Sequence, residues 1–170
     1  MKPVILAIAA ALALAAPALA ETKPADTKPA ATAPVVYPPY GRLVTLAEAK
    51  TAAAAAEAEA RKNGWNMVVT VVEPNGAMVL SQKMDGTQYG SNDVARRKAE
   101  TAATFKRPTS YFQEAVKAGT LNAIFTGALA IEGGELLIVD NVVVGAIGVS
   151  GGTGAQDGQV ARAAASAILR

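Results

Sequence analysis

Residues 67–82 read MVVTVVEPNGAMVLSQ, and this stretch decides the fold class. Residues 67–72 are a β-branched run, and the Pro-Asn-Gly signal at 74–76 separates them from a second apolar run at 77–82. The stretch therefore predicts a β-hairpin. Because the first strand is apolar on both faces, we expect it to lie at the centre of a sheet that helices cover on both sides.

Capping signals mark four helices around this hairpin. Each begins at a Ser or Thr whose side chain can accept a hydrogen bond from the first helical turn, and glycine or proline follows three of the four. Three of the starts have the full capping-box pattern: Thr45–Glu48, Ser110–Gln113 and Thr153–Gln156. The predicted helices are 46–62, 91–105, 110–118 and 154–168.

The last part of the chain is rich in glycine and predicts a second group of strands. Nine of the fifteen glycines lie between 127 and 158. Short apolar runs at 129–131, 135–139 and 142–149 are joined by turn residues, so we expect a meander of three strands. Strands in two hairpin-joined groups, separated by helices, indicate an α/β domain with a largely antiparallel sheet.

Composition excludes several function classes. The 170 residues contain no cysteine and no histidine, and their formal net charge is +2. Disulfide frameworks, thiolate catalysis, Cys-ligated zinc and serine–histidine triads are therefore ruled out. Aromatic residues make up only 5% of the chain, and the charge is nearly balanced, so we expect no nucleic-acid partner.

The first twenty residues have the pattern of a secretory signal peptide. Lys2 supplies a positive charge, 4–16 is an unbroken apolar run, and Ala18-Leu19-Ala20 is a small-x-small cleavage site. The apolar run is shorter than the roughly 20 residues that cross a bilayer. We therefore expect export to the periplasm or beyond, with no membrane span after cleavage.

The sequence then divides into a linker and a domain. Residues 21–41 hold five of the nine prolines and read as an extended linker, either a spacer or a solubilising tail. The folded domain is expected over 42–170. Five consecutive alanines at 52–56 would let its first helix pack closely against another, which favours a homo-oligomer, although alanine's helix propensity alone also explains them.

Two features of the domain could bind an anion. The glycine-rich turn before the last helix points backbone N–H groups outward at Gly151, Gly152 and Thr153, although it matches neither a Walker A nor a dinucleotide loop. Alternatively, the turn is purely structural, and Gly145 and Gly148 before it allow close packing of strand against helix. Lys98 shares a helix face with small and apolar residues, so we expect it to be drawn into a pocket.

Several short motifs, taken in order, resemble the GlcG/HbpS-like family, which includes extracellular haem-binding proteins and the C-terminal domain of PduO-type adenosyltransferases. They cover most of 43–169 and are Met84-Asp-Gly86, Lys98-Ala-Glu-Thr-Ala102, Arg107-Pro-Thr109, Gly133-Gly134, Gly145-Ala-Ile-Gly148-Val-Ser-Gly151-Gly152 and Gln156-Asp157. The resemblance implies an α/β/α layered domain with a five-stranded antiparallel, profilin-like sheet. It also implies a symmetric homo-oligomer and haem as the cofactor.

If haem binds, its propionates need cations or free N–H groups. Lys98, Arg107 and the amides of Gly151, Gly152 and Thr153 could supply them. Histidine, the commonest axial ligand, is absent, so oxygen or sulfur must hold the iron. Thr109 is the first choice, with its role as a helix-capping hydroxyl as the alternative; Tyr111, Tyr89 and Met84 are the other candidates.

Three functions remain open at this stage. The first is an exported haem carrier, scavenger or sensor with weak, non-histidine iron ligation. The second is an oligomeric scaffold or partner-binding module. The third is an enzyme that acts on a small carboxylated or carbonyl compound through Lys98, although no spacing among the carboxylates names a reaction. The sequence does not decide whether the protein is an enzyme.

Overall fold

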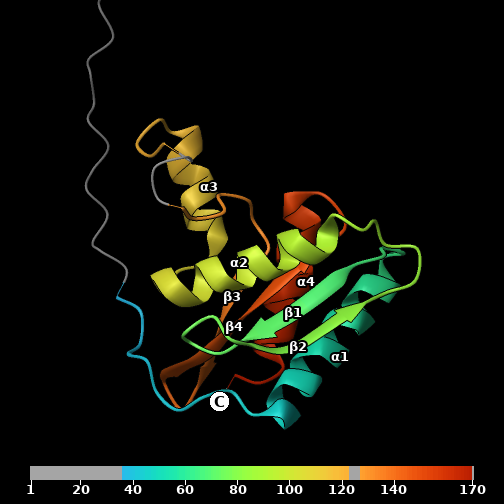
Figure 1. The fold of residues 1–170 in the computed structure, drawn as a ribbon, viewed down its shortest axis with the longest axis horizontal. Coiled ribbons are helices and arrows are strands. Elements are labelled where there is room, and N and C mark those ends of the chain that lie inside the picture. Colours follow the sequence, from blue (N-terminus) through green and yellow to red (C-terminus); the bar gives the residue numbers. More distant parts are fainter. Residues whose placement is uncertain (1–35, 123–126, 170) are drawn as a thin grey trace, which may run out of the picture. The chain divides into compact units, whose positions relative to one another are not determined.

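The computed structural model describes residues 36–122 and 127–169, so the predicted signal peptide and most of the predicted linker lie outside the described residues (Figure 1). The described part is an α/β domain. Its helices and strands, in chain order, are α1 (Leu46–Lys62), β1 (Val68–Val72), β2 (Met78–Lys83), α2 (Ser91–Phe105), α3 (Thr109–Lys117), β3 (Gly134–Val139), β4 (Val142–Ser150) and α4 (Gly154–Ser166).

The predicted hairpin forms and lies where the apolar run placed it. β1 pairs antiparallel with β2 on one side and with β4 on the other. All five residues of β1 are buried, which confirms the central position expected from its two apolar faces. The sheet order is β2-β1-β4-β3, and every pairing within it is antiparallel.

The sheet has four strands among the described residues, so the prediction of five is wrong. Residues 129–131 do not form a strand. The Leu129 N–H donates to the Thr101 hydroxyl of α2, and the Leu129 carbonyl accepts from Ile131 in a local turn. Their backbone groups are therefore engaged outside the sheet, which a short apolar run alone does not reveal.

Helices cover both faces of the sheet (Figure 1). On one face, Val69 and Val71 of β1 belong to a hydrophobic core with the buried alanines of α1 and α4. On the other face, Val72 packs with Ala146 of β4 and with three buried alanines of α2. This alternation is the period-2 arrangement of a strand buried on both sides, and it gives the α/β/α layering that the sequence predicted.

Of the two glycines of β4 that were expected to allow close packing of strand against helix, Gly148 has that role. A Cβ on Gly148 would collide with the backbone of Ala95 and Ala99 in α2. A Cβ on Gly145 would instead meet the backbone of Val72 in the neighbouring strand β1, so this glycine serves packing within the sheet. Helix α2 therefore rests directly on the backbone of β4, and this brings Lys98 of α2 close to the sheet.

Two of the predicted capping boxes form and one does not. The hydroxyls of Thr45 and Thr153 accept from the first turns of α1 and α4. The box at Ser110–Gln113 is absent, because α3 begins one residue earlier than predicted. The side-chain oxygen of Gln113, Oε1, accepts from the Glu132 N–H instead. Ser91 is the first residue of α2 rather than its cap.

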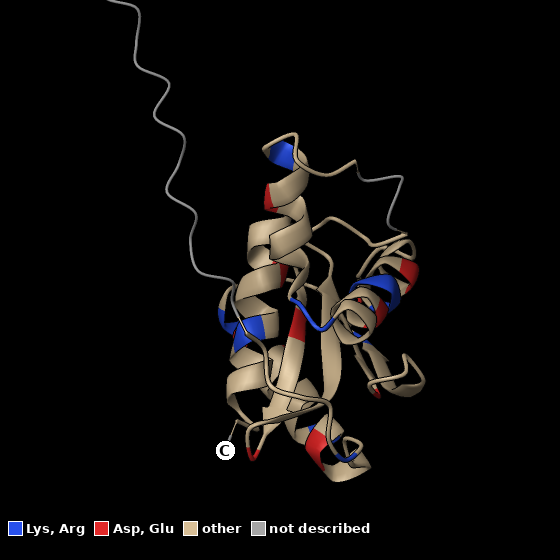
Figure 2. Ribbon diagram, turned by 90° about the vertical axis from the view of Figure 1, so that its left-hand side faces the viewer, with Lys and Arg blue, Asp and Glu red and all other residues tan. Residues whose placement is uncertain are grey.

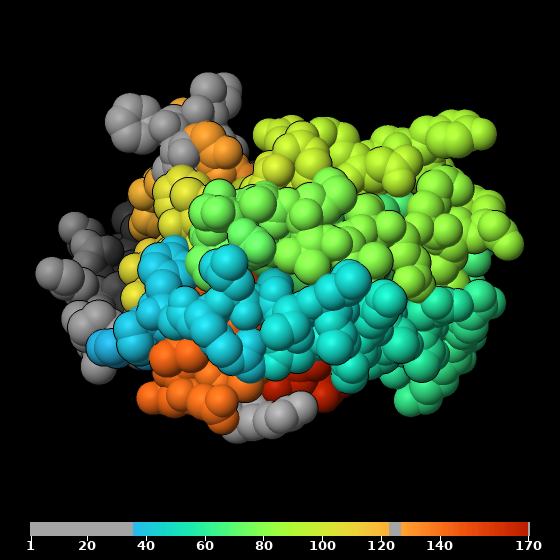
Figure 3. Space-filling model, turned by 60° about the horizontal axis from the view of Figure 1, so that its bottom comes forward, coloured from blue at the N-terminus to red at the C-terminus, as the bar shows by residue number. Residues whose placement is uncertain are grey.

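The end of the predicted linker lies along the domain. The Pro39 carbonyl accepts from the Val143 N–H, and the Gly41 N–H donates to the Val143 carbonyl. Figure 3 shows this blue-to-cyan segment crossing the surface between the green β1–β2 hairpin and the orange β3–β4 turn. The Tyr40 hydroxyl also donates to the Ala103 carbonyl at the end of α2, at 2.6 Å. These contacts place Tyr37 and Tyr40 beside the α2–α3 junction.

Candidate functional site

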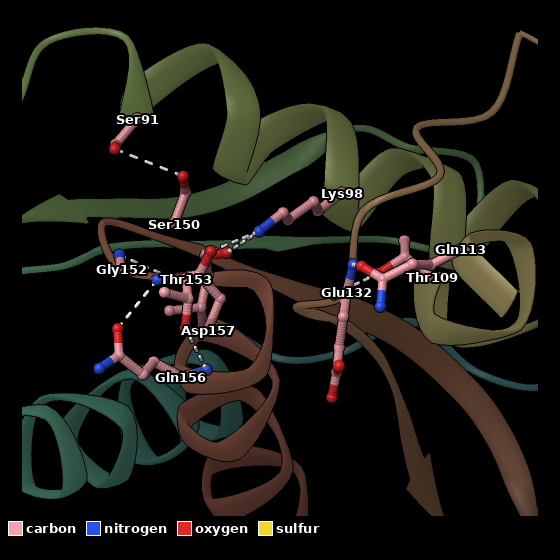
Figure 4. Close-up of polar contacts among 12 residues, drawn as sticks. Ser91, Lys98, Thr109, Gln113, Glu132, Ser150, Gly152, Thr153, Gln156 and Asp157 are labelled. Carbon is pink, nitrogen blue, oxygen red and sulfur yellow. Dashed lines mark hydrogen bonds and ion pairs between the residues drawn. The ribbon is translucent and has the colours of Figure 1, made fainter. Parts of the chain in front are cut away.

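Among residues 36–122 and 127–169, the ion pair between Lys98 and Asp157 is the buried one. The Lys98 Nζ lies 2.6 Å from Asp157 Oδ2 and also donates to the Val149 carbonyl at 3.0 Å. The second carboxylate oxygen of Asp157 accepts from the Gly152 N–H at 2.9 Å. Figure 4 shows Lys98 reaching from α2 towards Asp157, which lies in the first turn of α4 as the sequence indicated. The pair ties α2, β4 and α4 together.

Burial lowers the pKa of Lys98 from its usual 10.5, and Asp157 opposes that effect. The Lys98 side chain has no exposed surface, and a Cβ on Gly133 would lie 2.8 Å from its Nζ, so the backbone closes over the amine. Lys98 turns inward as expected, but its amine lies in the packed interior and not in a pocket. The amine is held by protein groups and presents no free face to a propionate or a substrate carbonyl.

Two of the three predicted turn amides are likewise occupied. The Gly152 N–H donates to Asp157, and the Thr153 N–H donates to the Gln156 side chain within the capping box. The glycine turn therefore serves the start of α4 and the buried ion pair. Its N–H groups at Gly152 and Thr153 are not arranged as an open anion cradle.

Thr109, the first choice as iron ligand, is fully buried. Its hydroxyl accepts from the Gly134 N–H at 2.8 Å, at the start of β3. A Cβ on Gly134 would lie 2.6 Å from the Thr109 methyl group, so this junction is tightly packed. The hydroxyl thus satisfies a buried backbone donor 25 positions away. It does not cap α3, the alternative expected for it, because Pro108 is the N-cap of that helix.

Arg107 and Tyr111 lie together on the surface where α2 meets α3. The Arg107 guanidinium carbon lies 4.4 Å from the centre of the Tyr111 ring, a cation–π contact, and Tyr37 lies 6.0 Å away from it. Tyr111 is 47% exposed and Phe105 is 39% exposed. We call Phe105, Arg107 and Tyr111 the aromatic surface.

The aromatic surface is held firmly from below by Phe112. Its ring packs edge-on against both Phe105 and Tyr111, with ring centres 5.3 Å apart in each case, and it is itself buried. The surface therefore offers flat apolar rings, a phenol and a guanidinium in fixed positions. The sequence named Arg107 and Tyr111 separately but did not show that they touch.

The two remaining candidate ligands have different surroundings. Tyr89 is 87% exposed, and Lys83 lies 5.6 Å from its ring, without an aromatic neighbour among the described residues. Met84 is buried beneath the hydrophobic core cluster at 7% exposure. Only Tyr111 of the four candidates combines exposure with a neighbouring apolar ring and a cation.

A second charged cluster was not anticipated from the sequence. Arg162 of α4 lies 2.7 Å from Glu132 and 3.6 Å from Glu135 of β3. Burial raises the pKa of Glu135 to about 7, because desolvation outweighs the attraction of Arg162. Arg162 follows the two acids by 27 and 30 positions in the chain, so only the packing of α4 on β3 brings the arginine to them.

Charges of both signs are distributed over the helices (Figure 2). Across residues 36–122 and 127–169 there is no group of three or more acidic side chains that could hold a metal ion. Within the same residues, no helix is both long and apolar enough to cross a bilayer.

The fold is a layered α/β/α domain, with the Arg107-Pro-Thr109 motif at the α2–α3 junction and the glycine turn before α4. These features indicate the class of protein to which the chain belongs. A family model described as haem degrading protein HbpS-like matches residues 44–166. The chain is therefore a member of the HbpS-like family, as the motifs suggested.

Individual relatives agree with this assignment. Protein GlcG of Escherichia coli is 38% identical over 99 residues, which cover 57% of this chain and 73% of GlcG. The crystal structure of a double mutant of Streptomyces reticuli HbpS superimposes with a TM-score of 0.69 at 34% identity, covering 81% of this chain and 98% of HbpS. A PduOC–haem complex gives a TM-score of 0.67 at 25% identity, covering 74% of this chain and 95% of PduOC.

Proposed function

We propose that this protein binds haem at the aromatic surface and that the Tyr111 phenol is the iron ligand. The observation that carries the proposal is the contact between Tyr111, which can ligate iron, and Arg107, which can pair with a propionate, on an exposed apolar platform. A family relationship to HbpS and a structural likeness to a PduOC–haem complex support haem as the ligand class.

The residues of the aromatic surface fit the chemistry of haem. Phenolate oxygen is an established axial ligand for haem iron, and the chain has no histidine to compete with it. The neighbouring guanidinium can pair with a propionate. Phe105 offers an apolar ring to the macrocycle. Bound haem would bring redox-active iron, which none of these side chains supplies.

The interior fits haem less well. Lys98, Thr109 and the amides of Gly152 and Thr153 all have protein partners, and an anion would have to displace them. Breaking the buried Lys98–Asp157 pair would cost about 3–5 kcal/mol. We therefore assign the pairing with a propionate to Arg107. The buried groups stabilise the fold instead.

An open surface site with one oxygen ligand suits haem that is exchanged rather than stored. Tyr111 and Phe105 both remain accessible to solvent, so a bound macrocycle would be covered on one side only. This favours a carrier or scavenger over an electron-transfer protein with tightly held haem. With the leader-like residues 1–20, it supports a role outside the cytoplasm.

A haemin titration followed at the Soret band tests the proposal. Tyr89→Phe is the matched control for Tyr111→Phe, because both remove one hydroxyl from an exposed tyrosine beside a cation. We expect saturable binding at one haem per chain, a changed spectrum and weaker binding in Tyr111→Phe, and wild-type behaviour in Tyr89→Phe. Absence of saturable binding in the wild type overturns the function, and equal effects of the two variants overturn the site.

Export and oligomerisation are separate parts of the proposal. Expression of the full chain followed by mass spectrometry of the extracytoplasmic fraction should find an N-terminus at Glu21, and an intact N-terminus in the cytoplasm would contradict export. Light scattering of the mature protein should report a homo-oligomer. A monomer at tens of micromolar would contradict that expectation.

A further inference from the structure

A pocket lies at the opposite end of α2 from the aromatic surface. It has a volume of about 320 Å³, which is within the range of about 300–1,000 Å³ that small-ligand sites occupy. It forms where the end of α1, the loop before α2 and the glycine turn before α4 meet. Its lining residues are Gly64, Trp65, Asn66, Gly86, Thr87, Gln88, Gly151, Gly152 and Gln156.

The lining contains no charged side chain. The pocket is open because four of its nine lining residues are glycines, which place no side chain in it. Gly64 and Gly86 have positive φ angles of 71° and 77°, so the turns that shape the rim require glycine there. A Cβ on Gly86 would lie 3.2 Å from the side-chain nitrogen of Asn66.

The polar groups of the pocket are neutral amides with free hydrogen-bonding capacity. Within the described residues, the side chains of Asn66 and Gln88 have no protein hydrogen-bond partner, although each carries donors and an acceptor. Gln156 accepts from Thr153 through its oxygen, and its NH₂ group has no partner in the same part of the chain (Figure 4). Three amides that can each donate thus surround one space.

Trp65 adds an aromatic side chain to the lining. It is half-buried, packs against the hydrophobic core cluster and also lines the pocket, so its position is fixed from behind. An indole face beside several side-chain amides is the combination that matches a sugar ring. The C–H groups of one ring face stack on the indole, and the hydroxyls at the rim both donate to and accept from amides.

We propose that this pocket binds a neutral carbohydrate unit, stacked on Trp65 and hydrogen-bonded by Asn66, Gln88 and Gln156. A carboxylated or phosphorylated ligand finds no cation among the lining residues, and an apolar one would leave the three amides unpaired. The site is separate from the haem site, shares no residue with it and stands or falls independently.

Trp65 is the only tryptophan of the chain, so its fluorescence reports on this pocket alone. The haem-free protein is titrated with methyl α-D-glucopyranoside, methyl α-D-galactopyranoside and N-acetyl-D-glucosamine, each to about 50 mM, to detect a Kd of about 1 mM or tighter. Sodium acetate and sodium phosphate at the same ionic strength are the charged comparisons. We expect a saturable change in emission with at least one sugar and none with either anion.

Variants locate the binding. Asn66→Ala and Gln88→Ala remove exposed side chains that have no hydrogen-bond partner among the described residues, so both proteins should fold and retain haem binding. Each should raise the Kd for the sugar about threefold to tenfold, which is the effect of losing one net hydrogen bond. Gln159→Ala, an exposed amide of α4 outside the pocket, is the control and should not weaken it. The proposal is overturned if no sugar gives a saturable change, if an anion gives the stronger one, or if neither pocket variant weakens binding.

Discussion

Glu135 should make the protein less stable as the pH rises through neutrality. Its side chain is 16% exposed, and burial raises its folded-state pKa from about 4.5 to about 7. The folded protein therefore holds this proton more tightly than the unfolded chain does. The stabilisation is complete below about pH 4.5 and is lost as the pH rises to about 7.

The size of the effect follows from the pKa difference. At about 1.4 kcal/mol per pKa unit, the difference between 4.5 and 7 corresponds to at most about 3 kcal/mol. Glu135→Gln removes the titrating group and keeps its shape. The variant should gain up to about 3 kcal/mol over the wild type above pH 7, and this gain should vanish near pH 4.

Urea unfolding at a series of pH values measures this difference. Glu114→Gln is the control, because Glu114 is an exposed acid of α3 whose pKa Lys117 lowers rather than raises. That variant should show no gain at high pH. If Glu135→Gln and the wild type have the same pH dependence, then ionised Glu135 carries no burial cost and the reasoning is refuted.

Three further substitutions test the interior. Asp157→Ala should lower the free energy of unfolding, measured with urea, by about 3–5 kcal/mol, because it leaves the Lys98 amine buried without its counter-charge. Substitution of both residues by apolar ones should recover much of that loss. Thr109→Val should cost about 1–3 kcal/mol by orphaning the Gly134 N–H, yet leave the haemin titration unchanged; a lost Soret band would restore Thr109 as the ligand. Gly148→Ala should prevent α2 from docking, seen as loss of cooperative thermal unfolding, whereas a native-like transition would contradict the close approach.

Local signals predicted most of the secondary structure. The capping boxes at Thr45 and Thr153 and the turn at 73–76 depend on neighbours in the sequence, and the structure forms all three. Residues 129–131 carry the same kind of apolar signal as a strand. Their backbone hydrogen-bond partners, however, are Thr101 and one another. A contact with a residue 28 positions away cannot be recognised from the neighbouring sequence.

The candidate site was predicted residue by residue but not as an arrangement. Small neighbours indicated that Lys98 turns inward, but its pairing with Asp157, 59 positions later, depends on how α2 and α4 cross the sheet. Arg107 and Tyr111 lie four positions apart, a spacing that could have suggested contact had both been on one helix. They are separated by the Pro108 helix start, so the fold had to supply the geometry.

The central claim is that Tyr111 lies at the haem iron, and the absence of histidine from the chain permits a direct measurement. Tyr111→His would place the chain's only imidazole at the proposed ligand position, and Tyr89→His would place one at the control tyrosine. The absorption and electron paramagnetic resonance spectra of the haemin complexes should change from oxygen to nitrogen ligation in Tyr111→His and stay as in the wild type in Tyr89→His. A Tyr111→His complex with the wild-type spectrum would contradict the account.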